Sequence, residues 1–170
     1  MILTFSKNGH SHIDVDVGKP EILAALGLVE ADWLPAAREV LCLRVDADAA
    51  ARRAAVATGD AGQMAEYQEA RTEALALLAV ERSKKAIDPA AYPMLAASLG
   101  TDIDPLTGEP ATDLLGVARS VSAAADAYQA YGAAVRKARL SGKAAIRAAG
   151  SAQAAQAAYD GITWPGIPAA

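Results

Sequence analysis

The residues best suited to chemistry in this 170-residue sequence are two histidines close to its beginning. His10 and His12 are two positions apart, and Asp14 and Asp16 continue the same spacing. Imidazole nitrogens and carboxylate oxygens bind transition metals, and residues two apart share one face of a strand. Two histidines cannot complete a coordination shell alone, although a threefold axis would bring six imidazoles together. The alternative is a solvated polar face, and we predict no metal site and no cofactor.

A second group of oxygen donors surrounds Gly108. Its members are Asp102, Asp104, Thr107 and Glu109. An EF-hand needs an oxygen ligand at the fifth position of the loop, where this sequence has Leu106. Turn chemistry accounts for the segment instead. The sequence also has no phosphate-binding loop, zinc-protease motif or nucleophile elbow. We therefore predict no enzyme and no small-molecule substrate.

Five cations gather towards the end of the last long helix that the sequence predicts. They are Arg136, Lys137, Arg139, Lys143 and Arg147. No aromatic residue lies among them, and the whole chain carries 16 basic against 20 acidic residues, a net charge of −4. A general phosphate binder needs a surplus of cations. We therefore predict no nucleic-acid partner and interpret the cations as a solvated helix surface that favours the negative end of the helix.

The largest apolar anchors are the two tryptophans, in a chain with only 5% aromatic residues. Trp164 lies in a tail rich in proline and glycine, where it either folds back onto the helices or docks into a partner. Large aromatic side chains dominate the binding energy of many interfaces. We predict Trp33, Trp164 and Ile167 as partner-binding residues.

The composition favours long, thinly packed helices. Alanine supplies 44 of the 170 residues, and it has the highest intrinsic helix propensity. A sandwich or a large parallel sheet would need more β-branched and aromatic residues. The single cysteine, Cys42, excludes an intrachain disulfide. We see no signal peptide and no apolar run long enough for a membrane span, so we predict a soluble, mainly α-helical protein without a membrane partner.

Residues 1–18 predict a β-hairpin for attachment or oligomerisation. Met1–Phe5 is short and β-prone, His12–Val17 alternates polar with apolar residues, and Asn8-Gly9 is typical of a tight hairpin turn. Strict alternation would place Ile13, Val15 and Val17 on one face and the histidines with Asp14 and Asp16 on the other.

The remaining chain predicts short helices over 19–46, a long-helix region over 47–150 and a C-terminal tail over 151–170. Pro20 suits the first turn of a helix that reaches Leu26, and Asp32 suits the cap of the next one. Glycines predict a break near 58–62, a loop over 100–110 and an interruption at Gly142. Apolar residues of the last helix recur every three or four positions and predict a coiled-coil-like seam of Leu114, Val117, Val121, Tyr128, Tyr131 and Val135.

Three segments within 52–165 resemble Ala-rich proteins of tailed bacteriophages. The first runs from Gly59-Asp60-Ala61-Gly62-Gln63-Met64 through Glu66-Tyr67-Gln68-Glu69-Ala70 to Glu73-Ala74-Leu75-Ala76-Leu77-Leu78. Asp88-Pro89-Ala90-Ala91-Tyr92-Pro93-Met94-Leu95 and the stretch from Val135 to Trp164-Pro165 are the others. The hairpin and residues 100–110 lie outside the resemblance.

The resemblance implies a tail-fibre assembly protein or fibre chaperone. The expected partner is then a phage tail-fibre protein, bound through helical and hairpin surfaces in the host cytoplasm during assembly. A structural component of the mature tail, retained in the virion, is the alternative. In both cases we expect a homo-oligomer.

Overall fold

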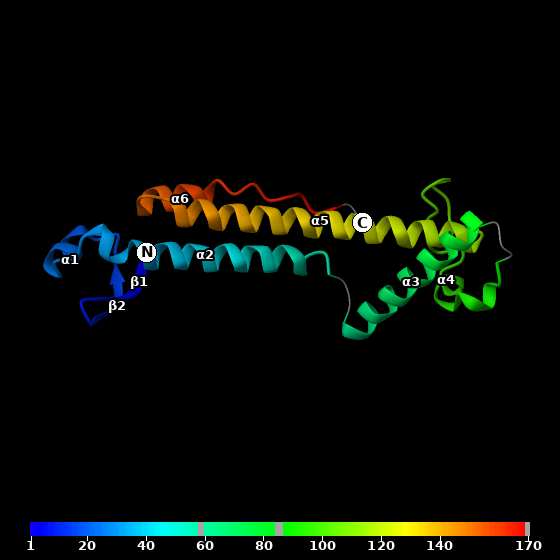
Figure 1. The fold of residues 1–170 in the computed structure, drawn as a ribbon, viewed down its shortest axis with the longest axis horizontal. Coiled ribbons are helices and arrows are strands. Elements are labelled where there is room, and N and C mark those ends of the chain that lie inside the picture. Colours follow the sequence, from blue (N-terminus) through cyan, green and yellow to red (C-terminus); the bar gives the residue numbers. More distant parts are fainter. Residues whose placement is uncertain (58–59, 84–86, 169–170) are drawn as a thin grey trace. The chain divides into compact units, whose positions relative to one another are not determined.

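The computed structural model describes residues 1–57, 60–83 and 87–168 of the chain. It is mainly helical with an N-terminal β-hairpin, which confirms the predicted fold class (Figure 1). The contacts divide the chain into two compact units. Unit 1 comprises Met1–Ala55 and Ala133–Ile167, and unit 2 is built from Val56–Gly132. Helix α5 (Leu114–Ala148) contributes residues to both units, and each unit has its own apolar core.

The hairpin of unit 1 consists of strands β1 (Ile2–Lys7) and β2 (His10–Asp16), which pair antiparallel. Asn8 and Gly9 have φ angles of 51° and 80°, so both residues adopt the left-handed conformation that a type I′ turn requires. The turn predicted from Asn8-Gly9 is therefore confirmed.

The predicted faces of the second strand are wrong, because a bulge interrupts its alternation. Leu3 pairs with Val15 while Phe5 pairs with His12, and Asp14 takes a positive φ of 54° between those pairs. The extra residue turns Ile13 outward, with 69% of its surface exposed, and leaves His12 on the side of Phe5.

Two helices follow the hairpin. Helix α1 (Pro20–Ala25) is the short helix predicted from Pro20, and α2 (Glu30–Ala54) is a single helix of 25 residues. Helix α2 runs through residues 46 and 47, where we expected short helices to give way to longer ones. Asp32 is not the N-cap: it is the third helical residue, and its carboxylate accepts the backbone N–H of Val29 at 2.8 Å.

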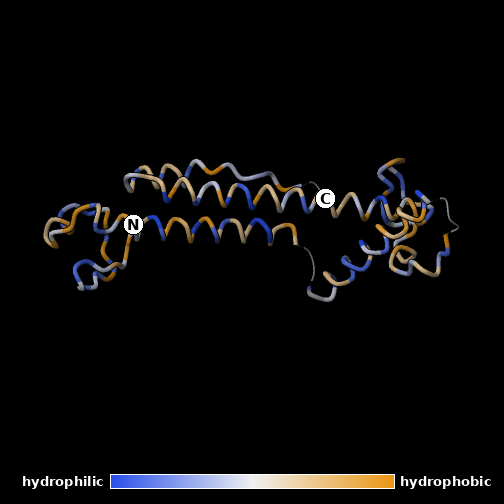
Figure 2. The backbone as a smooth tube through the Cα atoms, in the orientation of Figure 1, coloured by the Kyte–Doolittle hydropathy of each residue, from blue (hydrophilic) through white to orange (hydrophobic). Residues whose placement is uncertain are grey.

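The helical layer of unit 1 pairs α2 with the second half of α5 in antiparallel directions (Figure 1). Helix α6 (Ala152–Asp160) and the tail after it lie against this pair. The buried core contains Leu41, Cys42, Val45, Ile146 and Ala155. Apolar and polar positions alternate along α2 and α5, as an amphipathic layer requires (Figure 2).

Gly142 does not interrupt α5, contrary to our prediction. The helix continues to Ala148, and Gly142 lies buried where the tail crosses it. A Cβ atom at this position would overlap Cδ1 of Ile162 and lie 2.8 Å from its Cγ1. The glycine therefore allows a close approach between helix and tail.

Unit 2 contains α3 (Ala61–Ser83), a 3-10 turn η1 (Pro89–Ala91), α4 (Pro93–Ala97) and the first half of α5. The gap between α2 and α3 confirms a break near 58–62, of which 58–59 lie outside the described residues. The core is formed by apolar side chains from α3, α4 and α5, with Leu77, Leu95 and Val117 fully buried. Residues 100–110 form the predicted loop, which a bridge between Ile103 and Pro110 closes.

Candidate functional site

Trp33 attaches the hairpin to α2. Its side chain is 7% exposed and packs in one cluster with Leu3 of β1 and Ala37 of α2. Next to it, the Lys7 ammonium donates to Asp32 Oδ2 at 2.7 Å and to the Gly27 carbonyl at 2.9 Å. The hydrogen bond from Lys7, followed by that from the Val29 N–H, holds the pKa of Asp32 below its ordinary value. The structure thus places Trp33 in the core of unit 1.

The two histidines do not meet the aspartates on a common face. The His12 ring stacks on Phe5 with 5.2 Å between the ring centroids and 18° between the planes. Within residues 1–57, 60–83 and 87–168, no three His, Cys, Asp or Glu side chains are placed to hold a metal ion.

Side chains of α2 hold the turn between α5 and α6 at both of its ends. The Arg38 guanidinium donates to the carbonyl of Ala149, immediately after α5. The Glu30 carboxylate accepts the backbone N–H of Ala152, the first residue of α6. A cation at a helix C-terminus and an anion at an N-terminus both match the helix dipole. These two contacts fix the direction in which α6 and the tail return along α2.

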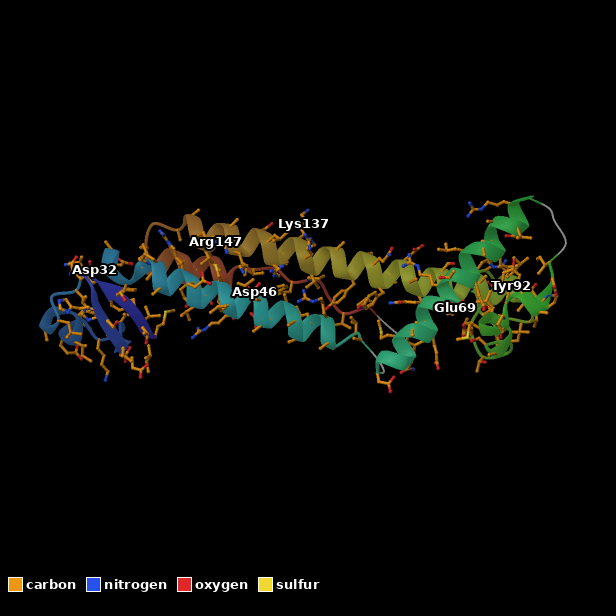
Figure 3. The ribbon with its side chains drawn as sticks, turned by 60° about the horizontal axis from the view of Figure 1, so that its bottom comes forward. Asp32, Asp46, Glu69, Tyr92, Lys137 and Arg147 are labelled. Carbon is orange, nitrogen blue, oxygen red and sulfur yellow. The ribbon has the colours of Figure 1, made fainter. Side chains whose placement is uncertain are left out.

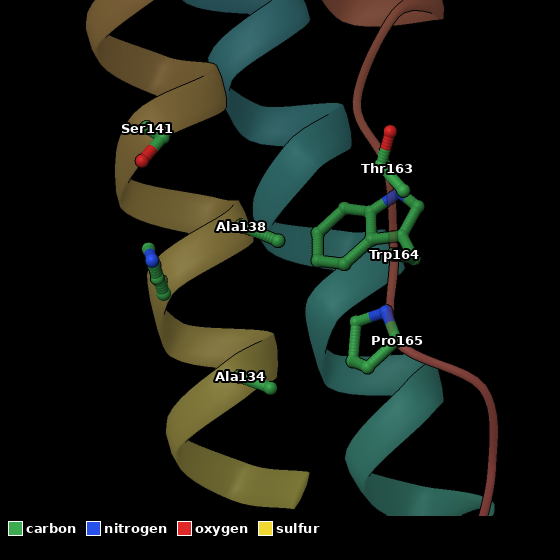
Figure 4. Close-up of a pocket in the computed structure, with 7 residues that line it drawn as sticks. Ala134, Ala138, Ser141, Thr163, Trp164 and Pro165 are labelled. Carbon is green, nitrogen blue, oxygen red and sulfur yellow. The ribbon is translucent and has the colours of Figure 1, made fainter.

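Trp164 folds back within unit 1, which is one of the two alternatives that its sequence left open. The guanidinium of Arg52 lies 4.9 Å from the centroid of its ring, and Trp164 is half-buried against the core. An open apolar groove runs between the tail and α5 (Figure 4). Its lining is Ala134, Lys137, Ala138, Ser141, Thr163, Trp164 and Pro165. Ile167, the third predicted anchor, is 59% exposed beyond this groove.

A hydrogen bond strengthens the contact between α6 and α2 on the same side. The Tyr159 hydroxyl donates to Asp48 Oδ2 at 2.8 Å, and this bond raises the pKa of Tyr159. Asp48 and Arg52 are four residues apart on α2, so they mark the flank of the helix that α6 and the tail cover.

A three-residue ion cluster lies on another flank of the α2–α5 pair. Asp46 of α2 accepts from Arg139 Nε at 2.6 Å and from Lys143 Nζ at 2.5 Å. The hydrogen bonds from Lys143 and then Arg139 lower the pKa of the Asp46 carboxyl. We interpreted the five cations as a solvated helix surface, but two of them, Arg139 and Lys143, bind one carboxylate of the neighbouring helix.

The predicted seam along α5 is divided between the units. Leu114, Val117 and Val121 pack in the core of unit 2 with α3 and α4. Tyr131 and Val135 are also buried, whereas Tyr128 is 46% exposed.

Two buried carboxylates organise unit 2. Glu73 of α3 accepts the backbone N–H groups of Met94 and Leu95 at 2.9 and 3.1 Å, and so caps the first turn of α4. Asp104 of the loop receives two bonds from Arg119, at 3.0 Å to Oδ1 and 2.6 Å to Oδ2. Asp104 belongs to the group of oxygen donors around Gly108 and is thus paired with a guanidinium. The hydrogen bond from Arg119 is the main cause of the lowered pKa of Asp104.

Sequence reasoning missed these polar contacts for two different reasons. Glu73 directly precedes the buried Ala74 and lies one helical turn before the buried Leu77, and a charged residue beside apolar ones is a signal that we did not use. Asp104 and Arg119 are fifteen residues apart across a loop, and Asp46 is 93 residues from Arg139. No local spacing indicates either pair.

None of the helices in the described parts of the chain has both the length and the apolar character that crossing a bilayer requires. Comparison with protein-family models, with curated proteins and with solved structures finds no match to this chain.

Proposed function

We propose that this protein is a non-enzymatic bacteriophage tail-fibre assembly protein, a chaperone that binds the fibre. The observation that carries the proposal is the β-hairpin. Its sheet has two strands among the described residues, so β1 and β2 each keep one edge without a partner strand. An unpaired edge can add a strand from another chain through backbone hydrogen bonds.

The outer side of the hairpin suits such a contact. Ile2 and Ile13 are 64% and 69% exposed, while Leu3 and Val15 are buried. The hairpin therefore offers apolar side chains beside its open edges, and the Trp33 cluster holds it on α2. A fibre chaperone would use this surface to cover strand edges of the fibre until the fibre has assembled.

The identity of the partner rests on the resemblance of the three segments within 52–165. Those segments include most of α3, the turn before α4 and the α5–tail layer, and each of the two cores contains residues from them. The hairpin lies outside them and supplies the contact that we assign to the fibre.

A capture experiment tests the hairpin as the contact. The tagged protein is co-expressed with the tail-fibre protein of the same phage, and the captured fibre protein is quantified. The Ile13→Lys variant should capture much less fibre protein than the wild type, because a lysine on an edge strand opposes strand addition. Leu75→Lys is the matched control, since Leu75 is 55% exposed on α3, and it should capture fibre protein as the wild type does. Equal capture by Ile13→Lys and wild type would refute the hairpin contact.

Mass spectrometry of salt-washed phage particles separates the chaperone from the structural alternative. Peptides of this chain should be absent from particles but present in lysates alongside the fibre protein. Stoichiometric presence in particles would instead make the chain a component of the tail.

A further inference from the structure

The α2–α5 pair of unit 1 has a second flank, which α6 and the tail do not cover. Asp48 and Arg52 mark the covered flank of α2. Successive residues of an α-helix are rotated by about 100° around its axis, so Asp46 points about 200° away from Asp48. The other flank is therefore the one that carries the ion cluster of Asp46, Arg139 and Lys143. We call it the open face.

The open face consists of two stripes with alternating spacings of four and three residues. On α2 the stripe is Glu39, Leu43, Asp46, Ala50 and Arg53. On α5 it is Arg136, Leu140, Lys143 and Arg147, and Arg139 reaches it through Asp46. Two adjacent stripes with this spacing match the pattern against which a further helix packs.

Each stripe has an exposed leucine near its middle. Leu43 is 58% exposed and Leu140 is 48% exposed, while the ion cluster between the helices is half-buried. A helix laid along this face would cover both leucines and the alanine next to them.

The charge of the open face is opposite to that of the chain. Five cations and two carboxylates give it a net charge of +3, whereas the protein carries −4. Within the described residues Arg53, Arg136 and Arg147 form no ion pair and are exposed, and Figure 3 labels Arg147 on α5. Free cations on both sides of an apolar centre complement an amphipathic helix with acidic flanks.

We propose that the open face is a docking site for an acidic amphipathic helix of a partner protein. The leucines bind its apolar stripe, and Arg53, Arg136 and Arg147 pair with its carboxylates. A phosphate polymer would match the cations but would gain nothing from two exposed leucines. The proposal stands on this face alone and does not depend on the hairpin contact with a fibre.

A binding assay with designed peptides tests the proposal. The probe is a labelled peptide of about three heptads with leucine at both seam positions and glutamate at the flanking ones, and its counterpart has lysine in place of glutamate. Fluorescence anisotropy with the full chain should show the acidic peptide binding at least about tenfold more tightly than the basic one.

Matched variants locate the binding. Arg136→Glu should weaken binding of the acidic peptide at least about fivefold, because it reverses a charge on the face. Lys137→Glu makes the same change at the next residue, which lines the tail groove instead, and should change the affinity by less than about twofold. Leu140→Ser should also weaken binding at least about fivefold. Circular dichroism should show wild-type helix content in all three, since each residue is exposed or lines an open groove.

Four outcomes would overturn the proposal. Equal affinity for the two peptides would mean that the open face does not select an acidic helix. Equal losses of affinity for the acidic peptide in Arg136→Glu and Lys137→Glu would mean that the peptide does not bind at the open face. Unchanged binding in Leu140→Ser, together with displacement of the peptide by duplex DNA or anionic vesicles, would identify a polyanion site. A dimer in sedimentation equilibrium that Leu140→Ser dissociates would identify a second copy as the occupant.

Discussion

Substitution of Gly142 by alanine tests how the tail is seated on α5. Alanine is favoured over glycine in a helix interior by about 1 kcal/mol, so local propensity predicts a more stable protein. The added methyl group would overlap the side chain of Ile162, however, and overpacking of this kind costs about 1–3 kcal/mol. We expect the steric cost to prevail, with a net loss of about 1 kcal/mol in the free energy of unfolding.

The sign of the effect should reverse when Ile162 is shortened. Every Ile162 atom close to the new methyl group is a Cγ or Cδ atom, and Ile162→Ala removes all of them. In that background Gly142→Ala should stabilise the protein by up to about 1 kcal/mol. The coupling between the two positions would then be about 2 kcal/mol, well beyond the few tenths expected of independent sites.

Gly132→Ala is the control on the same helix. Apart from its chain neighbours and the backbone of its own helix, a Cβ atom there would have no atom within 4 Å, so the substitution should stabilise the protein by about 0.5–1 kcal/mol. Urea unfolding followed by far-ultraviolet circular dichroism gives the free energies. Tryptophan emission reports on unit 1, because both Trp33 and Trp164 belong to it. Equal stabilisation by Gly142→Ala and Gly132→Ala in the wild-type background would refute the close packing of the tail on Gly142.

Three further predictions concern the cores and the buried carboxylates. Leu77→Ala should cost about 2–5 kcal/mol in urea unfolding, because it empties a fully buried position of unit 2; a loss below about 1 kcal/mol would contradict that core. Glu73→Leu should cost about 1–3 kcal/mol, because two N–H groups of α4 lose their acceptor, and amide exchange at Met94 and Leu95 should accelerate; unchanged exchange at both residues would argue against the cap. The lowered pKa of Asp46 means that its contribution to stability is complete above its ordinary pKa near 4 and is lost as the pH falls through the lower folded-state value. Asp46→Asn should therefore be less stable than the wild type at pH 7. As the pH falls below the folded-state pKa of Asp46, the free energies of unfolding of the two proteins should converge. A difference in free energy that stays constant from pH 7 to this acidic range would exclude the linkage.

Local patterns in the sequence were sufficient to predict the hairpin and the mainly helical character of the chain. Asn8-Gly9 supplies two residues that tolerate positive φ, Pro20 suits a helix start, and the alanine content favours helix throughout. The apolar spacing on α5 also indicated its buried positions Leu114 and Val117. These features depend on a residue and its near neighbours, which is why a single sequence reveals them.

The tertiary structure decided the features that depend on distant partners. Gly142 lies inside α5, where the tail takes the space that a side chain would need, and His12 turns towards Phe5 because a bulge shifts the pairing of the strands. Asp46 meets Arg139 only once α2 and α5 lie side by side, so the cluster at the centre of the open face has no local signature. The sequence by itself determined that the chain is mainly helical with an N-terminal hairpin, and packing between remote segments determined which helix faces remain available for a partner.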